Sequence, residues 1–330
     1  MTSIYITEHG AFLHKKGGKL VIDKDDAALM EVPLELVEDI TIVNTAQISA
    51  SLITECFAKN IPVSWISTSG NLIGSLTSHE SVDILKHKQQ FDLLSQERFY
   101  FKVAQEVVSA KTHNQLTLLR RYNRSINSAK ATEMIDYIVK MRKNIKYSSD
   151  TNELMGYEGL IGRSYFAALG SLVAKPFAFE RRTRQPPRNP FNSMLSLGYS
   201  MLFNEVLSAI TAAGLHPYVG FLHQLKKGHP ALASDLMEEW RAVIVDSLVM
   251  ALVNRGSVKA DMFTTNKSGC FFTPEGRKVF LAAYNKKLRT ENKYMDGGRT
   301  YRESIRHQCR EYARAVMNKE AELYEPVKLR

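Results

Sequence analysis

The hydrophobic pattern changes its period once along this 330-residue chain, near residue 85. Up to that point short apolar runs alternate with turns containing Gly, Asp and Asn, a pattern that is typical of β-strands. One helix is expected over Ala50–Lys59, because apolar residues recur there at helical spacing behind Ser49, a good N-cap. The predicted strands are Ile4–Thr7, Lys19–Ile22, Ala28–Val32, Val37–Val43, Pro62–Ile66 and Leu72–Leu76.

Beyond this point the apolar positions follow long helical patterns. The predicted helices are Ser95–Leu119, Ser125–Lys143, Asn152–Leu172, Asn192–Gly214, Ala233–Asn254, Glu275–Asn285 and Thr300–Met317. Residues 86–95, rich in Lys, Gln and His, are predicted to be a linker. We therefore predict an α+β fold of two domains, a small N-terminal mostly β domain over 1–85 and a larger all-α C-terminal catalytic domain over 96–330.

The charge is distributed as unevenly as the periodicity. Residues 1–85 hold 5 Lys and Arg against 11 Asp and Glu, whereas residues 86–330 hold 39 against 23. A basic field of that size attracts polyanions, so a nucleic-acid partner is indicated, although a merely solvated basic surface is the alternative.

Cysteine content and the chain's apolar runs restrict the class of protein further. Cys56, Cys270 and Cys309 form no CxxC pair, so neither a disulfide framework nor a cysteine-based zinc site is indicated. The N-terminus has no basic and apolar leader pattern, and no apolar run reaches 18 residues. We expect a soluble cytoplasmic protein without a membrane partner.

Four residues in the second half form a candidate metal site, namely Glu158, His223, Asp235 and Glu238. One imidazole and several carboxylates suit Mg²⁺ or Mn²⁺, the ions used in phosphodiester chemistry. Asp235 shares a helix face with both Glu238 and Glu239, which lie three and four residues further on, so spacing does not choose between these two glutamates.

Each of these residues also has a purely structural interpretation. Glu158 would pair with Arg163 or another arginine, and His223 would be an ordinary hydrogen-bonded histidine. Asp235 would cap its helix, and Glu238 would pair with Arg241 one turn later.

Arginines are concentrated in a segment whose two adjacent prolines prevent a regular helix. Arg binds phosphate bidentately, so this segment is a candidate DNA contact, with a solvated loop as the alternative. The DNA-binding candidates are Arg163, Arg181, Arg182, Arg184, Arg188, Lys226, Lys227 and Arg241. Tyr165, Tyr199 and Tyr218 would stack on unpaired bases or be ordinary residues at the edge of the core.

Other chemistries have no anchor in the sequence. There is no GxxxxGK[ST] loop, no GxGxxG after a strand, no HExxH and no GxSxG elbow. Nucleotide hydrolysis, dinucleotide binding, zinc proteolysis and serine hydrolysis are therefore not indicated.

Several motifs together resemble a known family over nearly the whole chain. They are Tyr157-Glu158-Gly159 with Arg163 and Tyr165-Phe166, Ser196-Leu197-Gly198-Tyr199 after Asn192, and residues 214–223, 235–241 and 272–278. In these motifs the chain is similar to the CRISPR-associated integrase family, the larger of the two shared spacer-acquisition proteins.

This resemblance implies a homodimer formed through the N-terminal β domain and assembled with a smaller CRISPR-associated adaptation protein. It also implies Glu158, His223 and Glu238 as ligands of Mg²⁺ or Mn²⁺, with Asp235 supporting catalysis. The expected reaction joins the 3′-hydroxyl of a captured DNA fragment to CRISPR repeat DNA by transesterification. A general metal-dependent nuclease and a non-catalytic DNA-binding scaffold remain the alternatives.

Overall fold

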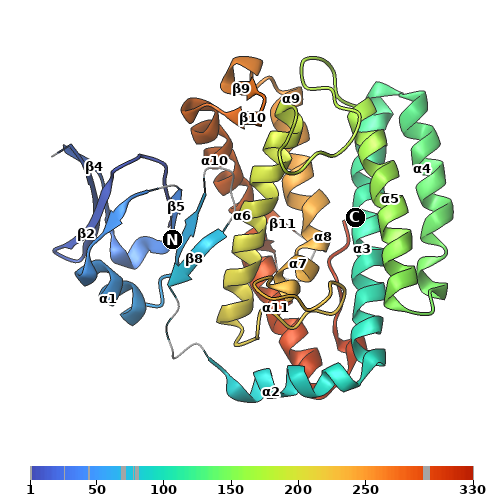
Figure 1. The fold of residues 1–330 in the computed structure, drawn as a ribbon, viewed down its shortest axis with the longest axis horizontal. Coiled ribbons are helices and arrows are strands. Elements are labelled where there is room, and N and C mark those ends of the chain that lie inside the picture. Colours follow the sequence, from blue (N-terminus) through green and yellow to red (C-terminus); the bar gives the residue numbers. More distant parts are fainter. Residues whose placement is uncertain are drawn as a thin grey trace. The chain divides into compact units, whose positions relative to one another are not determined.

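The computed structural model describes residues 2–25, 27–43, 45–67, 72–76, 78, 82–292 and 298–329. The chain divides into two compact units, Met1–Ser81 and Val82–Arg330. The first is rich in strands and the second is mostly helical, which confirms the predicted α+β class with two domains (Figure 1).

The first unit contains two four-stranded sheets. One has the order β1-β5-β7-β8, with β1 (Thr2–Ile6), β5 (Val37–Val43) and β7 (Val63–Ile66) parallel and β8 (Leu72–Leu76) antiparallel to β7. The other has the order β4-β3-β2-β6. Its strands are β4 (Ala27–Pro33), β3 (Lys19–Lys24), β2 (Phe12–Lys16) and β6 (Gln47–Ile48). A 3₁₀ turn, Leu34–Leu36, precedes β5.

Helix α1 (Ala50–Ala58) begins where the sequence predicts, with the Ser49 side chain accepting a hydrogen bond from the backbone N–H of Leu52. The core of this unit consists of apolar side chains from the strands and from α1, because alternate strand positions turn inward. Its fully buried members include Leu13, Leu20, Ile40, Ile42, Leu52 and Val63.

Strand β2 is missing from the prediction. It forms a hairpin with β3 through Gly17 and Gly18, whose φ angles are 54° and 79°. A two-residue glycine turn between alternating residues is a strong hairpin signal, so the sequence did contain the information for this strand. Strand β6, also missing, has only two residues and is too short to show a period.

The second unit is a bundle in which α3, α4 and α5 run side by side and α6 packs on α11 (Figure 1). The first six of its helices are α2 (Ile84–Asp92), α3 (Glu97–Ile126), α4 (Ala129–Arg142), α5 (Thr151–Ser171), α6 (Pro190–Ala212) and α7 (Ala231–Leu236). The others are α8 (Glu238–Trp240), α9 (Ser247–Asn254), α10 (Pro274–Leu288) and α11 (Tyr301–Asn318). Shorter 3₁₀ turns lie at Leu93–Ser95, Ile145–Tyr147, Ala260–Met262 and Ala321–Leu323.

The prediction of a linker over 86–95 is wrong, because these residues belong to α2 and the 3₁₀ turn after it. Asp83 caps α2 by accepting from the N–H of Lys86. The polar composition of this stretch suggested that its side chains are exposed to solvent. Gln90 is nevertheless buried, and its amide pairs with both the backbone N–H and the carbonyl of His216. A buried amide is stable when its own groups are satisfied in this way.

Two more predictions need correction. The second unit is not all-α, because β9 (Phe263–Asn266) pairs with β10 (Gly269–Phe272), and β11 (Glu291–Asn292) with β12 (Arg299–Thr300). The predicted helix Ala233–Asn254 is not uniform either. It is divided into α7, α8, a π-helical turn over Arg241–Asp246, and α9.

Across the part of the chain that the structure describes, the helices are too short or too polar to cross a membrane.

Candidate active site

A lysine and two glutamates from three segments meet inside the helical unit. Nζ of Lys111 on α3 contacts Oε1 of Glu158 on α5 and lies 2.6 Å from Oε2 of Glu238 on α8. The Lys111 and Glu238 side chains are only 9% and 5% exposed, whereas Glu158 is 28% exposed. The two carboxylates thus converge on one cation, and Glu158 is the member most accessible to solvent.

The positions of Lys111 and Glu158 follow from their helices. Glu158 comes four residues after Leu154 and three before Ile161, both buried, so it lies on the inward face of α5. Lys111 lies between the buried residues Val107 and Gln115 on α3. Contact between α3 and α5 then brings these inward charges together.

Arg241 is a second cation in this cluster. Its Nη2 lies 3.1 Å from Oε1 of Glu238, and its guanidinium lies 4.8 Å from the centre of the Tyr199 ring. Burial opposes ionisation of Glu238, but Arg241 and Lys111 outweigh it and lower the pKa of Glu238 to about 2. The predicted Glu238–Arg241 pair is confirmed. The alternative pairing of Glu158 with Arg163 gives way to Lys111, and Arg163 is exposed.

Asp235 organises the loop that carries His223. Its Oδ2 accepts from the backbone N–H groups of Phe221 at 2.6 Å and Leu222 at 2.9 Å, and its Oδ1 from that of His223 at 3.1 Å. The residue before them must be glycine, because a Cβ on Gly220 would come 2.5 Å from Oδ2 of Asp235. Asp235 therefore does not cap its own helix, and that alternative is wrong.

The same carboxylate orients the His223 ring. Nδ1 of His223 lies 2.5 Å from Oδ1 of Asp235, and because a carboxylate only accepts, Nδ1 carries the proton. This hydrogen bond raises the pKa of His223, against the opposing effect of burial. Nε2 is then the ring atom available to a ligand, an arrangement typical of metal-binding histidines.

Among the described residues no three His, Cys, Asp or Glu side chains are grouped so that they could hold a metal ion. The Lys111 ammonium stands between the two glutamates. The donors nevertheless fit a divalent cation, because Glu158 and Glu238 direct oxygens at one point and the buried Oε2 of Glu238 makes no hydrogen bond. Its nearest cation is the Lys111 ammonium, 2.6 Å away.

Glu239 has a different environment from its neighbour. Its Oε1 accepts from the Tyr324 hydroxyl at 2.6 Å, and its Oε2 accepts from the backbone N–H of Val327. Burial raises the pKa of Glu239 to about 8, although both hydrogen bonds act in the opposite direction. Glu239 thus holds the C-terminal segment, and Glu238 is the glutamate that faces Lys111.

Sequence reasoning missed two residues of this region, Lys111 and Asp246. Asp246 is buried and accepts hydrogen bonds of 2.5 Å from the hydroxyls of both Tyr165 and Tyr199. Stacking of these tyrosines on bases is therefore wrong, whereas Tyr218 is exposed. An aspartate inside the apolar stretch 242–250 was a usable signal for Asp246, but nothing near Lys111 distinguishes it from other lysines.

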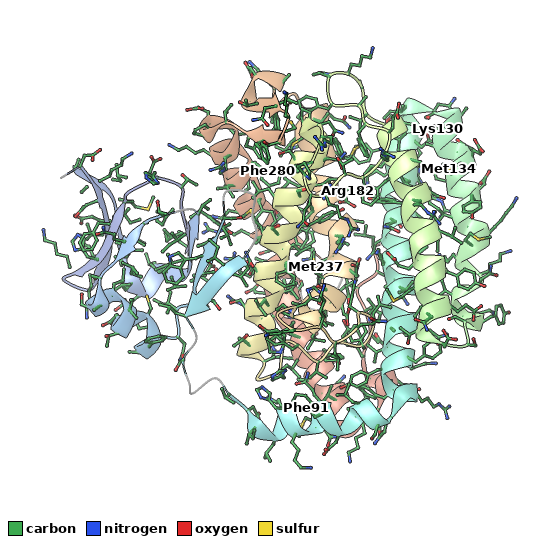
Figure 2. All side chains as sticks on the ribbon, viewed as in Figure 1. Phe91, Lys130, Met134, Arg182, Met237 and Phe280 are labelled. Atoms are coloured by element: carbon green, nitrogen blue, oxygen red, sulfur yellow. The ribbon has the colours of Figure 1, made fainter. Side chains whose placement is uncertain are left out.

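The basic candidates fall into two groups. Arg163, Arg181, Arg184, Arg188, Lys226 and Lys227 are exposed. Arg182 is instead fastened to α6, since its guanidinium donates to Oδ1 of Asn192 and Oγ of Ser196, each at 3.0 Å. Burial lowers the pKa of Arg182 to about 10. Figure 2 labels Arg182 and Met237, the residue before Glu238, among the helices of the second unit.

Residues 4–286 match the family described as CRISPR associated protein Cas1. The chain is 33% identical to the CRISPR-associated endonuclease Cas1 3 of Thermus thermophilus, over 99% of this chain and 97% of that protein.

Two solved structures, each 24% identical, share the fold. A casposase bound to integration product matches with a TM-score of 0.84 over 97% of this chain and 92% of its own. A chain of a Cas6-RT-Cas1–Cas2 complex matches with a TM-score of 0.85, and the likeness covers all of this chain but 36% of that longer one. Because the family match covers most of the chain and the similarity to the Thermus protein covers nearly all of it, this chain belongs to the CRISPR associated protein Cas1 family.

Proposed function

We propose that this chain is a metal-dependent DNA integrase of CRISPR adaptation, which joins the 3′-hydroxyl ends of captured DNA fragments to repeat DNA by transesterification. The observation that carries the proposal is the convergence of Glu158 and Glu238 on one cation position. Support also comes from the names of similar proteins, an endonuclease and a casposase bound to integration product.

Glu158, Glu238 and Nε2 of His223 would hold Mg²⁺ or Mn²⁺. When bound, the ion supplies polarisation of the scissile phosphate and stabilisation of the charge that develops during in-line displacement. Asp235 holds His223 in one tautomer and orientation. Arg241 compensates the charge of Glu238, and its guanidinium lies against the Tyr199 ring.

The exposed basic residues are the proposed DNA contacts. Arg181, Arg184 and Arg188 are exposed in the loop before α6, where Arg188 also donates to the backbone carbonyl of Lys267 at 3.1 Å. Lys226 and Lys227 follow His223, and Arg163 lies on α5. Phosphate binding by such residues is independent of base sequence. Arg182 and Arg241, by contrast, are engaged within the protein and would act on DNA only through the groups they hold.

The proposal includes two protein partners. One is a second copy of this chain, joined through the N-terminal β domain. The other is the smaller CRISPR-associated adaptation protein, supported by a Cas1–Cas2 assembly among the structures with this fold.

A metal-dependent nuclease is the second candidate, because it would use the same residues with water in place of the 3′-hydroxyl. The endonuclease name of the Thermus relative favours it. The two functions differ in their products, since a nuclease only cuts whereas an integrase joins strands.

Strand transfer with labelled 3′-hydroxyl DNA and a repeat-containing target tests the proposal, in Mn²⁺ or EDTA, with and without the smaller partner. Glu158→Gln and His223→Ala should abolish joining. Glu133→Gln, the same change at an exposed site on α4, should leave it intact. Joined products that persist in the first two variants would place the chemistry elsewhere. Cleavage without joining would support the nuclease, and metal-independent binding without reaction would support the scaffold.

A further inference from the structure

Four charged side chains at the candidate active site balance one another. Glu158 and Glu238 contribute two negative charges, and Lys111 and Arg241 contribute two positive ones. These four groups form one connected set of ion pairs, in which Lys111 contacts both carboxylates and Arg241 contacts Glu238. Because Lys111 and Glu238 are almost fully buried, water screens this cluster weakly.

A divalent cation placed between these carboxylates would meet two cations already there. It would leave the cluster with two uncompensated positive charges, which is costly in a poorly hydrated interior. A DNA phosphodiester brings negative charge to the same place. The electrostatics therefore favour the ion and the DNA together over the ion alone.

We infer that Lys111 couples metal loading to DNA binding: its ammonium holds the cation position between Glu158 and Glu238 until a DNA phosphate arrives with the divalent ion. This inference rests on the proposed function, since it concerns the same site. By thermodynamic linkage, DNA must raise the metal affinity by the same factor by which the metal raises the DNA affinity.

Lys111 is suited to this role and Arg241 is not. The Arg241 guanidinium is held by the Tyr199 ring as well as by Glu238, so it is confined to one position. Lysine carries a compact charge on a flexible four-carbon chain, and can withdraw from the carboxylates without any movement of the backbone. Its partner Glu158 is also the most accessible residue of the cluster.

A structural role for Lys111 is the competing explanation. In that case Lys111 only neutralises two carboxylates so that the unit can fold. Both explanations predict that replacing it destabilises the metal-free protein, because two like charges then lie close together. Only the coupling role predicts a change in how DNA affects metal affinity.

The test measures Mn²⁺ affinity from the electron paramagnetic resonance signal of free Mn²⁺, with and without a DNA duplex carrying 3′-hydroxyl overhangs. The full-length wild type should bind Mn²⁺ at least about tenfold more tightly with DNA, a factor equal to roughly 1.4 kcal/mol. Lys111→Met should bind Mn²⁺ more tightly without DNA by a similar factor and lose most of the DNA effect. Lys102→Met, the same change at an exposed site on α3, should behave as wild type.

Lys111→Gln serves if the Met variant folds poorly, and Mn²⁺ should raise its melting temperature more than that of the wild type. Equal Mn²⁺ affinity and an equal DNA effect in the Lys111 variants and wild type would overturn the coupling role. Glu158→Gln separates the two proposals. If Glu158→Gln still binds Mn²⁺, the ion lies elsewhere and the proposed metal site is overturned as well. If Glu158→Gln loses Mn²⁺ binding but the Lys111 variants bind Mn²⁺ as the wild type does, only the coupling role is overturned.

Discussion

Oδ1 of Asp235 holds His223 at two atoms, the ring Nδ1 at 2.5 Å and the backbone nitrogen at 3.1 Å. The ring and the loop that carries it are thus fixed by one buried carboxylate. Such preorganisation means that the histidine need not be ordered when a ligand arrives.

Asp235→Asn should reduce strand transfer by about 10- to 100-fold, the usual effect of losing a carboxylate that supports a metal-binding histidine. The two oxygens of Asp235 accept four hydrogen bonds, whereas asparagine has one acceptor oxygen and an NH₂ group that only donates, so it cannot accept all four. The assay is strand transfer in Mn²⁺, with Asp136→Asn at an exposed site on α4 as control. Full activity in Asp235→Asn would show that His223 is oriented by other contacts.

Glu239→Ala should lower the free energy of unfolding by about 2–4 kcal/mol, because the Tyr324 hydroxyl and the Val327 N–H would be left buried without their acceptor. Urea denaturation measures it. Truncation after Glu320 removes both donors and should make Glu239→Ala nearly neutral, if these contacts account for the loss. Additive effects of the two changes would refute that explanation.

The Asp246 carboxyl should make stability depend on pH. Burial raises its pKa to about 6 from an ordinary value of 3.8, although Tyr165 and Tyr199 oppose the shift. The folded state therefore keeps a proton that the unfolded chain has lost, so stability falls as pH rises from about 4 to about 6 and then levels off. The loss should approach about 3 kcal/mol.

Asp246→Asn should remove this component. The difference between wild-type and variant unfolding free energies, measured from pH 4 to pH 7, isolates it from other titrating groups. A difference that stays constant across this range would show that Asp246 does not titrate there.

Neighbouring arginines in the loop before α6 should differ in effect. Arg181→Ala should weaken DNA binding and reduce the slope of log affinity against log salt by about 0.9 if one phosphate contact is lost. Arg182→Ala should instead destabilise the protein, because Arg182 holds Asn192 and Ser196 on α6. Salt-dependent binding and thermal unfolding of both variants distinguish these outcomes. Equal salt slopes in Arg181→Ala and wild type would remove Arg181 from the DNA contacts.

Much of the fold could be predicted from the local pattern of apolar and polar residues. The N-cap Ser49, the strand Val37–Val43 and the main helices of the second unit occur where periodicity predicts them, because these features depend on residues close in sequence. Errors arose where a long-range contact overrides composition. The polar stretch 86–95 is helical partly because Gln90 pairs with His216, 126 residues away.

The sequence by itself supplied the residue types of the candidate active site, and the family resemblance supplied the choice among them. It did not determine how they are paired. Lys111 and Glu158 are 47 residues apart, and their contact exists because α3 packs on α5. Likewise Glu238 and Glu239 are equivalent in helical spacing, yet one faces Lys111 and the other faces Tyr324. Tertiary structure alone decides such choices, because the partners of a buried charge are set by the packing of distant segments and not by the spacing along one helix.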